Sequence, residues 1–102
     1  MYLIRRVFKC KPGTARRAAE QITKIGKSYE KVGQRSPIRV YTSGGTVPGP
    51  ADTVYMDWVA QVIDSPMRDG NAIPEEIRPV SQQMLDYVEN SYIEFYEMFE
   101  PR

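Results

Sequence analysis

Hydrophobic and polar positions predict β-strands in three separate stretches of the chain. Residues 2–11 are rich in β-branched and aromatic side chains and stop at a Pro-Gly turn signal. Residues 38–43 form a similar run, and residues 52–64 alternate strongly between apolar and polar side chains. β-Branched and aromatic enrichment and alternation with a period of two residues are both typical of β-strands, so we predict three strands in these stretches.

Between the first two strands, apolar residues recur three and four positions apart, which is the spacing of one face of an α-helix. Thr14 is a suitable N-cap, and Gly33 is suited to end the helix in a left-handed conformation. The apolar face comprises Ala15, Ala18, Ala19, Ile22, Ile25, Tyr29 and Val32. We therefore predict a helix that runs to about Val32 and buries one stripe.

A second helix is predicted after the third strand. Either Pro74 or Pro79 suits its first turn, and the pattern continues to about Asn90. Its apolar face comprises Ile77, Val80, Met84, Leu85 and Val88. The connections at 44–50 and 65–72 are expected to be irregular. The first holds three glycines and two prolines, and it is either a simple turn between strands or a lid over a pocket.

Residues 92–99 fit two structures. Their aromatic enrichment favours a strand, which would complete a sheet of four strands. Glu94, Glu97 and Glu100 are also spaced to share one side of a continued helix. We favour the strand because of the topology that it completes.

The resulting order is β-α-β-β-α-β, the ferredoxin-like arrangement. Right-handed crossovers place both helices on one face of a four-stranded antiparallel sheet. A chain of 102 residues has room for a single core, so residues 1–102 are predicted to form one α+β domain.

One face of this sheet is predicted to need a cover. In the third strand the wholly apolar set of alternate residues comprises Val54, Met56, Trp58, Ala60 and Val62, and it is expected beneath the helices, with Trp58 in the core. The other set comprises Tyr55, Asp57, Val59, Gln61 and Ile63. A face this apolar should be covered, and a second copy of the chain can cover it across a two-fold axis. We therefore predict a homodimer.

Charge and hydropathy argue against two classes of partner. Fourteen basic and thirteen acidic residues give a net charge of +1, without a long run of one sign, so neither nucleic acid nor an anionic membrane is expected as a partner. Residues 52–64 also lack the Lys/Arg-Gly-aromatic motif of RNA-recognition modules. No apolar run approaches the roughly 20 residues that span a bilayer. Without a signal-peptide pattern, we expect a soluble cytoplasmic protein.

The counts of histidine and cysteine limit the chemistry further. The chain has no histidine, the commonest zinc ligand and the usual haem ligand, so no metal and no cofactor is expected. Its single cysteine, Cys10, cannot form an intramolecular disulfide and is expected to be a buried structural thiol.

Short motifs along most of the chain resemble the dimeric α+β barrel superfamily, and within it the NIPSNAP-like branch. Arg6, Phe8 and the Lys-Pro-Gly turn match the first-strand motif of that branch, with Ile4 and Arg5 in place of its usual Glu and Leu. Residues 39–43, the Gly/Pro loop and residues 52–58 extend the likeness. The resemblance implies a homodimer whose sheets form a barrel, with a small cavity inside it or between sheet and helices. The superfamily includes cofactor-independent monooxygenases and haem-dependent dismutases, and a chain without histidine does not fit the dismutases.

The polar residues expected on the covered face form the candidate site. They are Arg39, Tyr41, Tyr55, Asp57, Glu94 and Tyr96, together with Arg5 or Arg6 from the first strand. In one interpretation they line a pocket in which arginine holds an anionic or carbonyl oxygen and tyrosines pack against an aromatic ring. In the other, which we favour, Arg39 or Arg6 pairs with Asp57 or Glu94 and neutralises groups that dimerisation buries.

The sequence leaves two main functional hypotheses and a third alternative. The first is a small-molecule-binding homodimer without known catalysis. The second is a cofactor-independent oxygenase acting on an aromatic or enolisable substrate, in which Asp57 would take the proton from the substrate. A structural ion pair is the more frequent role for such an aspartate, so we favour binding. A module that binds a protein through a sheet edge is a third possibility.

Overall fold

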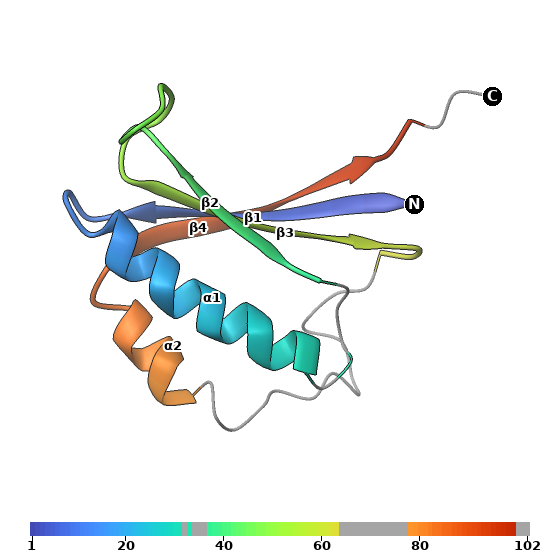
Figure 1. The fold of residues 1–102 in the computed structure, drawn as a ribbon, viewed down its shortest axis with the longest axis horizontal. Coiled ribbons are helices and arrows are strands. Elements are labelled where there is room, and N and C mark those ends of the chain that lie inside the picture. Colours follow the sequence, from blue (N-terminus) through green and yellow to red (C-terminus); the bar gives the residue numbers. More distant parts are fainter. Residues whose placement is uncertain (32, 34–36, 64–77, 100–102) are drawn as a thin grey trace.

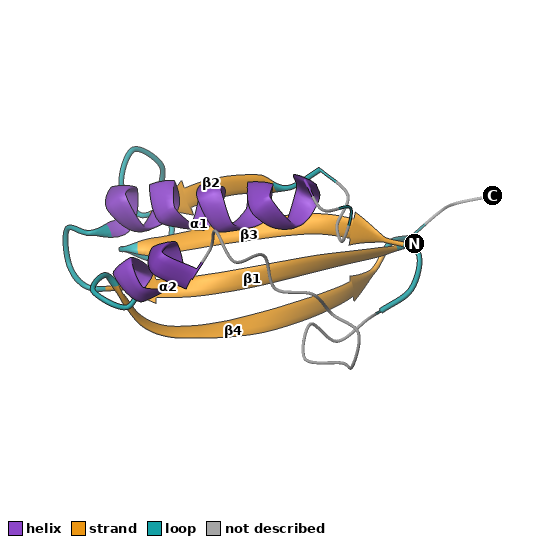
Figure 2. Ribbon diagram, turned by 90° about the horizontal axis from the view of Figure 1, so that it is seen from below, coloured by secondary structure: helices purple, strands orange, loops and turns teal. Residues whose placement is uncertain are grey.

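The computed structural model describes residues 1–31, 33, 37–63 and 78–99. Its elements are β1 (Tyr2–Cys10), α1 (Ala15–Lys31), β2 (Arg39–Ser43), β3 (Thr53–Ala60), α2 (Arg78–Met84) and β4 (Val88–Glu97). The strands form one antiparallel sheet in the order β2-β3-β1-β4 (Figure 1). This is the predicted ferredoxin-like α+β arrangement, and both helices lie on the same side of the sheet (Figures 1 and 2).

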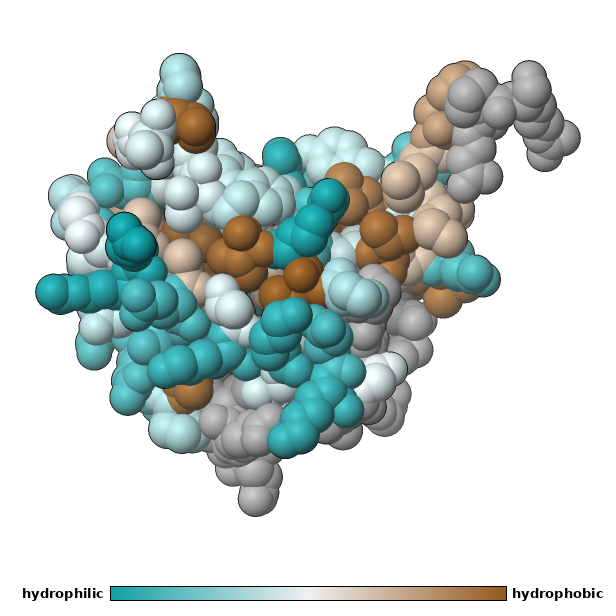
Figure 3. Space-filling model, viewed as in Figure 1, coloured by the Kyte–Doolittle hydropathy of each residue, from teal (hydrophilic) through white to brown (hydrophobic). Residues whose placement is uncertain are grey.

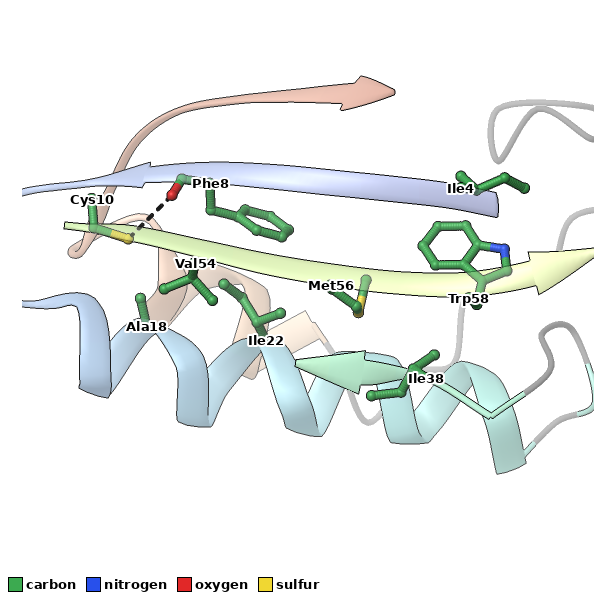
Figure 4. Packing of buried hydrophobic residues seen from close by; sticks show 9 residues of the cluster. All are labelled: Ile4, Phe8, Cys10, Ala18, Ile22, Ile38, Val54, Met56 and Trp58. Carbon is green, nitrogen blue, oxygen red and sulfur yellow. Dashed lines mark hydrogen bonds between the residues drawn. The ribbon is translucent and has the colours of Figure 1, made fainter. Parts of the chain in front are cut away.

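The predicted apolar stripe of α1 packs onto the sheet. Ala18 and Ile22 from α1 meet Phe8 from β1 and Val54 from β3 in the main core (Figure 4). The helix approaches β3 closely at Gly26, because a Cβ there would lie 2.8 Å from the sulfur of Met56. The absence of a side chain at this position therefore sets the distance between helix and sheet.

Both ends of α1 show how the sequence positions it. Gly33 adopts the left-handed conformation that was predicted, with φ 76°. Thr14 precedes the helix, but its hydroxyl donates hydrogen bonds to the carbonyls of Lys11 and Tyr87, at 2.7 and 3.2 Å. The side chain therefore ties the helix start to the residue after β1 and to the turn before β4.

The alternation of β3 is observed as predicted over the strand itself. Val54, Met56 and Trp58 are buried on the helix side, and Trp58 belongs to the core. The strand ends at Ala60, however, and residues 61–63 are exposed, so Val62 lies outside the core. Cys10 is buried, and its thiol donates to the carbonyl of Phe8 at 3.7 Å (Figure 4).

The prediction that the second helix reaches Asn90 was wrong. Helix α2 ends at Met84, and the next three backbone N–H groups each bond to the carbonyl three residues earlier, which forms a tight turn. Val88 then begins β4 and pairs with Cys10. Pro74 and Ile77 lie outside the described residues.

The tail forms the strand that we favoured. Strand β4 runs from Val88 to Glu97, pairs with β1 along its length and is an edge of the sheet. Met98 and Phe99 continue beyond the strand, where Met98 N donates to the carbonyl of Met1 at 3.0 Å. Neither of the two described helices is long and apolar enough to cross a membrane.

Candidate functional site

The sheet face opposite the helices, called the open face below, carries a row of alternating charges. Strand register places Arg39 of β2 opposite Asp57 of β3, Asp57 opposite Arg5 of β1, and Arg5 opposite Glu94 of β4. One residue from each strand therefore contributes to a row with the order plus, minus, plus, minus. We call these four residues the charge row.

Asp57 is the most buried member of the charge row, with 3% of its surface exposed. Arg39 clamps it at two points, from Nε to Oδ1 at 2.8 Å and from Nη2 to Oδ2 at 3.1 Å. The hydroxyl of Tyr41 donates to Oδ2 at 2.6 Å. Three charge-assisted hydrogen bonds thus hold the side chain of Asp57 in place.

Arg5 and Glu94 form the second ion pair of the row. The Nε and Nη2 groups of Arg5 lie 2.8 and 2.7 Å from Oε1 of Glu94. The hydrogen bond from Arg5 lowers the pKa of Glu94, and the same bond raises the pKa of Arg5. The guanidinium also lies over two aromatic rings, 5.1 Å from the centre of Tyr55 and 5.7 Å from that of Tyr96.

Two tyrosines stack beside the charge row. The rings of Tyr41 and Tyr55 are 5.3 Å apart and nearly parallel, with an angle of 15° between them. The hydroxyl of Ser43 donates its hydrogen to the carbonyl of Pro50 at 2.8 Å. Ser43 Oγ also lies 2.9 Å from the hydroxyl of Tyr55, and because the Ser43 hydrogen is already used, Tyr55 is the donor in this hydrogen bond. Burial, and next the bond to Asp57, raise the pKa of Tyr41. The stack is therefore anchored at both ends by hydrogen bonds.

Arg6 does not belong to this cluster. It lies on the helix side, in register with Met56 and Ile93, and its guanidinium lies 4.9 Å from the ring centre of Phe8. Burial lowers its pKa. The arginine of β1 on the open face is Arg5. The sequence held a signal for this, because Arg6 shares its alternation with Ile4, Phe8 and Cys10, whereas the set that contains Arg5 also contains Lys9.

The other predicted residues come together as expected from their alternation. Those on the open face are Arg39, Tyr41, Tyr55, Asp57, Glu94 and Tyr96. Together with Arg5, these residues form two ion pairs and one stack of two tyrosines. Asp57 already accepts three hydrogen bonds, so a role as a base would require it to leave Arg39 and Tyr41. Among the described residues, no cluster of acidic or cysteine side chains could hold a metal ion.

A concavity lies elsewhere, where α1 begins beneath the end of β2, beside the Gly/Pro loop for which a turn or a lid over a pocket was predicted. It has a volume of about 300 Å³. Its lining comes from the first turns of α1, from residues 42–46 and from Asp52. The loop after β2 is thus a connection between strands and also one wall of a hollow. Only the packing of this loop against α1 creates the hollow, so no local motif marks it.

Comparison with known proteins places the fold. A NIPSNAP family protein from Agrobacterium tumefaciens superposes with a TM-score of 0.69 over 97% of this chain and 93% of its own, at 13% identity. An uncharacterized NIPSNAP domain protein from Burkholderia xenovorans gives 0.66 over all of both chains, at 15% identity. The chain has the NIPSNAP fold.

A further structure shows how widely this fold is shared. An antibiotic biosynthesis monooxygenase superposes on the chain with a TM-score of 0.65 at 7% identity, over 98% of this chain and all of its own. No model of a known protein family and no curated protein sequence matches the chain. At these identities the likeness establishes the NIPSNAP fold, in agreement with the predicted NIPSNAP-like branch, and a shared fold does not by itself determine activity.

Proposed function

We propose that this protein is a homodimer that binds a small molecule between the open faces of its two sheets. The observation that carries the proposal is the charge row. Its four charges alternate in sign and pair within one chain, Arg39 with Asp57 and Arg5 with Glu94. A face that neutralises its own charges can be covered by a partner without burying an unpaired ion, which would otherwise be costly.

Exposed aromatic rings on the same face support a partner. Tyr41, Tyr92 and Tyr96 are 37%, 46% and 43% exposed. Tyrosine is enriched at protein interfaces because its ring buries a large apolar area and its hydroxyl keeps a polar contact. In the space-filling view the surface is hollowed between the projecting loop after β2 and the end of β4 (Figure 3). A second copy placed across this saddle would enclose the tyrosines of both chains.

The ligand that suits such an interior is aromatic and anionic. The side chain of Arg39 is 71% exposed although Asp57 fixes its position, so part of the guanidinium can still donate to an anion. The tyrosine stack beside it offers flat apolar surface to a ring. A positioned arginine next to aromatic side chains matches an aromatic carboxylate.

The hydrogen bonds that Asp57 already accepts favour ligand binding over oxygenation as the function. An oxygenase of the cofactor-independent kind needs a base that can accept a substrate proton. Arg39 and Tyr41 occupy both oxygens of Asp57, and the 300 Å³ concavity is lined by other residues. The fold that this chain shares with an antibiotic biosynthesis monooxygenase does not by itself provide a catalytic base.

Light scattering after gel filtration tests the dimer. We expect a mass of about twice 11.7 kDa at micromolar concentration. Tyr92→Asp should give a folded monomer because it places a charge on the open face. Phe95→Asp is the matched control, since Phe95 is equally exposed on the same strand but alternates to the other face. A wild-type monomer, or a Tyr92→Asp dimer, would disprove the arrangement.

Thermal shift measurements test the ligand. Benzoate and 4-hydroxybenzoate should raise the melting temperature of the wild type, and benzyl alcohol should not, because it lacks the carboxylate. Arg39→Gln should abolish the shift. Arg17→Gln, an exposed change on α1, is the control for charge alone. Equal shifts with benzyl alcohol would exclude recognition by arginine.

A further inference from the structure

The concavity between α1 and the loop after β2 is built from small residues. Ala15 and Ala19 line it from the helix, and Gly44 and Gly45 line it from the loop. Larger side chains at these four positions would fill the space. Its volume of about 300 Å³ is at the lower end of the range for small-molecule sites, so it suits a compact ligand.

Two opposite charges line this concavity without meeting each other. Arg16, from the first turn of α1, forms no ion pair with any carboxylate of the described residues. Asp52 precedes β3, and its Oδ1 accepts a hydrogen bond from Gly13 N at 3.0 Å. Within the described part of the chain its Oδ2 has no donor. The walls thus offer one cation and one carboxylate oxygen.

The carboxylate is fixed in place. The backbone carbonyl of Asp52 accepts a hydrogen bond from Cys10 N at 2.8 Å, in addition to the bond from Gly13 to its side chain. Two anchors therefore hold this residue at the edge of the concavity. A fixed acceptor favours binding, because little side-chain freedom is lost when a ligand donates to it.

From this arrangement we propose a second site, which binds a small zwitterion carrying one ammonium and one carboxylate group. The ammonium donates to Asp52 Oδ2, and the carboxylate accepts from the guanidinium of Arg16. Thr42 and Thr46, which also line the concavity, offer hydroxyl groups to polar atoms between the two charges. A simple anion would be repelled by Asp52, and a simple cation by Arg16, so the pair selects a molecule with both charges.

This site goes beyond the proposed function, because all its described walls belong to one chain. It lies between α1 and the end of β2, whereas the charge row lies on the open face. Figure 1 shows that α1 is on the opposite side of the sheet from that face. Occupancy should therefore be the same in the wild type and in the Tyr92→Asp variant. Failure of the dimer and failure of this site are thereby distinguishable.

The probes are two isomers that carry both charges, 2-aminobutyrate and 4-aminobutyrate, in which the charges are close and distant. Butyrate keeps only the carboxylate, and propylamine keeps only the ammonium. Two-dimensional NMR of isotope-labelled protein follows the backbone amides of Gly44, Gly45 and Thr46. We expect at least one zwitterion to shift these signals saturably with a Kd near 1 mM or below, and both single-charge analogues to bind at least about tenfold more weakly.

Substitutions test each charge separately. Asp52→Asn keeps the acceptor for Gly13 and tolerates the left-handed backbone at this position, where φ is 50°. It should weaken the zwitterion at least about tenfold, as should Arg16→Gln. Arg17→Gln, the neighbouring exposed arginine outside the lining, should leave the Kd unchanged.

Three results would overturn the proposal. The first is the absence of saturable shifts with either isomer. The second is butyrate or propylamine binding as tightly as the zwitterions. The third is an unchanged Kd in Asp52→Asn or Arg16→Gln protein whose spectrum shows the native fold.

Discussion

Arg39 and Asp57 differ sharply in exposure although they form a two-point ion pair. The arginine side chain is 71% exposed, whereas the aspartate side chain is 4% exposed. The carboxylate therefore depends on its neighbours for every hydrogen bond, while the guanidinium can still reach solvent or a ligand. This asymmetry makes Asp57 the fixed member of the pair and makes the donors around it the sensitive positions.

Tyr41 is one of those donors, and its removal tests the anchoring of Asp57. We predict that Tyr41→Phe lowers the free energy of unfolding by about 1–2 kcal/mol, because a buried carboxylate oxygen loses a donor while the ring can still stack on Tyr55. Urea denaturation measures the change. Tyr92→Phe is the control, since the Tyr92 hydroxyl has no hydrogen bond to the described residues, and it should stay within about 0.5 kcal/mol. Equal losses in the two variants would contradict the anchoring role.

Much of the fold could be predicted because its signals are local. Alternation in β3 separates Trp58 from Asp57 without knowledge of any neighbour, and the spacing in α1 marks its buried stripe. The end of α2 could not be predicted, because Leu85 and Val88 continue the helical spacing. Strand pairing between Val88 and Cys10 decides that boundary, and such pairing joins distant parts of the chain.

The sequence predicted which residues form the candidate site, but not which of them pair with each other. Alternation places Arg39, Tyr41 and Asp57 on one face once the strands are assigned. Alternation along β1 separates Arg5 from Arg6, but which residue of β4 lies opposite Arg5 depends on the register between β1 and β4. A lid over a pocket was one interpretation of the Gly/Pro loop, but the sequence does not identify the opposite wall, because α1 and this loop only become neighbours in the folded chain.

Gly44 controls the loop that borders both sites. It has a φ of 78°, and a Cβ there would overlap the backbone of Ala51 and the carbonyl of Pro50. We predict that Gly44→Ala lowers the free energy of unfolding by about 2 kcal/mol or more, through strain and backbone displacement. Gly45→Ala is the control, because its Cβ would meet no atom within 4 Å. Thermal unfolding of both variants should show a large loss for the first and a small change for the second.

Cys10 should be unreactive in the folded protein. Its surface is 6% exposed, and burial raises the pKa of the thiol above its ordinary value, so little thiolate is present or accessible at neutral pH. We predict that a disulfide reagent such as DTNB labels the folded chain slowly and the urea-unfolded chain rapidly. Fast stoichiometric labelling under native conditions would contradict a structural thiol.

Acid should weaken the fold through Glu94. Its pKa is lowered in the folded chain by the hydrogen bond from Arg5, so its stabilising effect is complete above its ordinary pKa of about 4.5 and is lost as the pH falls towards the lower folded value. We predict that Glu94→Gln flattens the decline of the urea midpoint below about pH 4.5. Glu89→Gln, on the same strand but without an ion pair to the described residues, should leave that decline unchanged. The same acid dependence in the wild type and in Glu94→Gln would show that the pair between Arg5 and Glu94 does not form in solution.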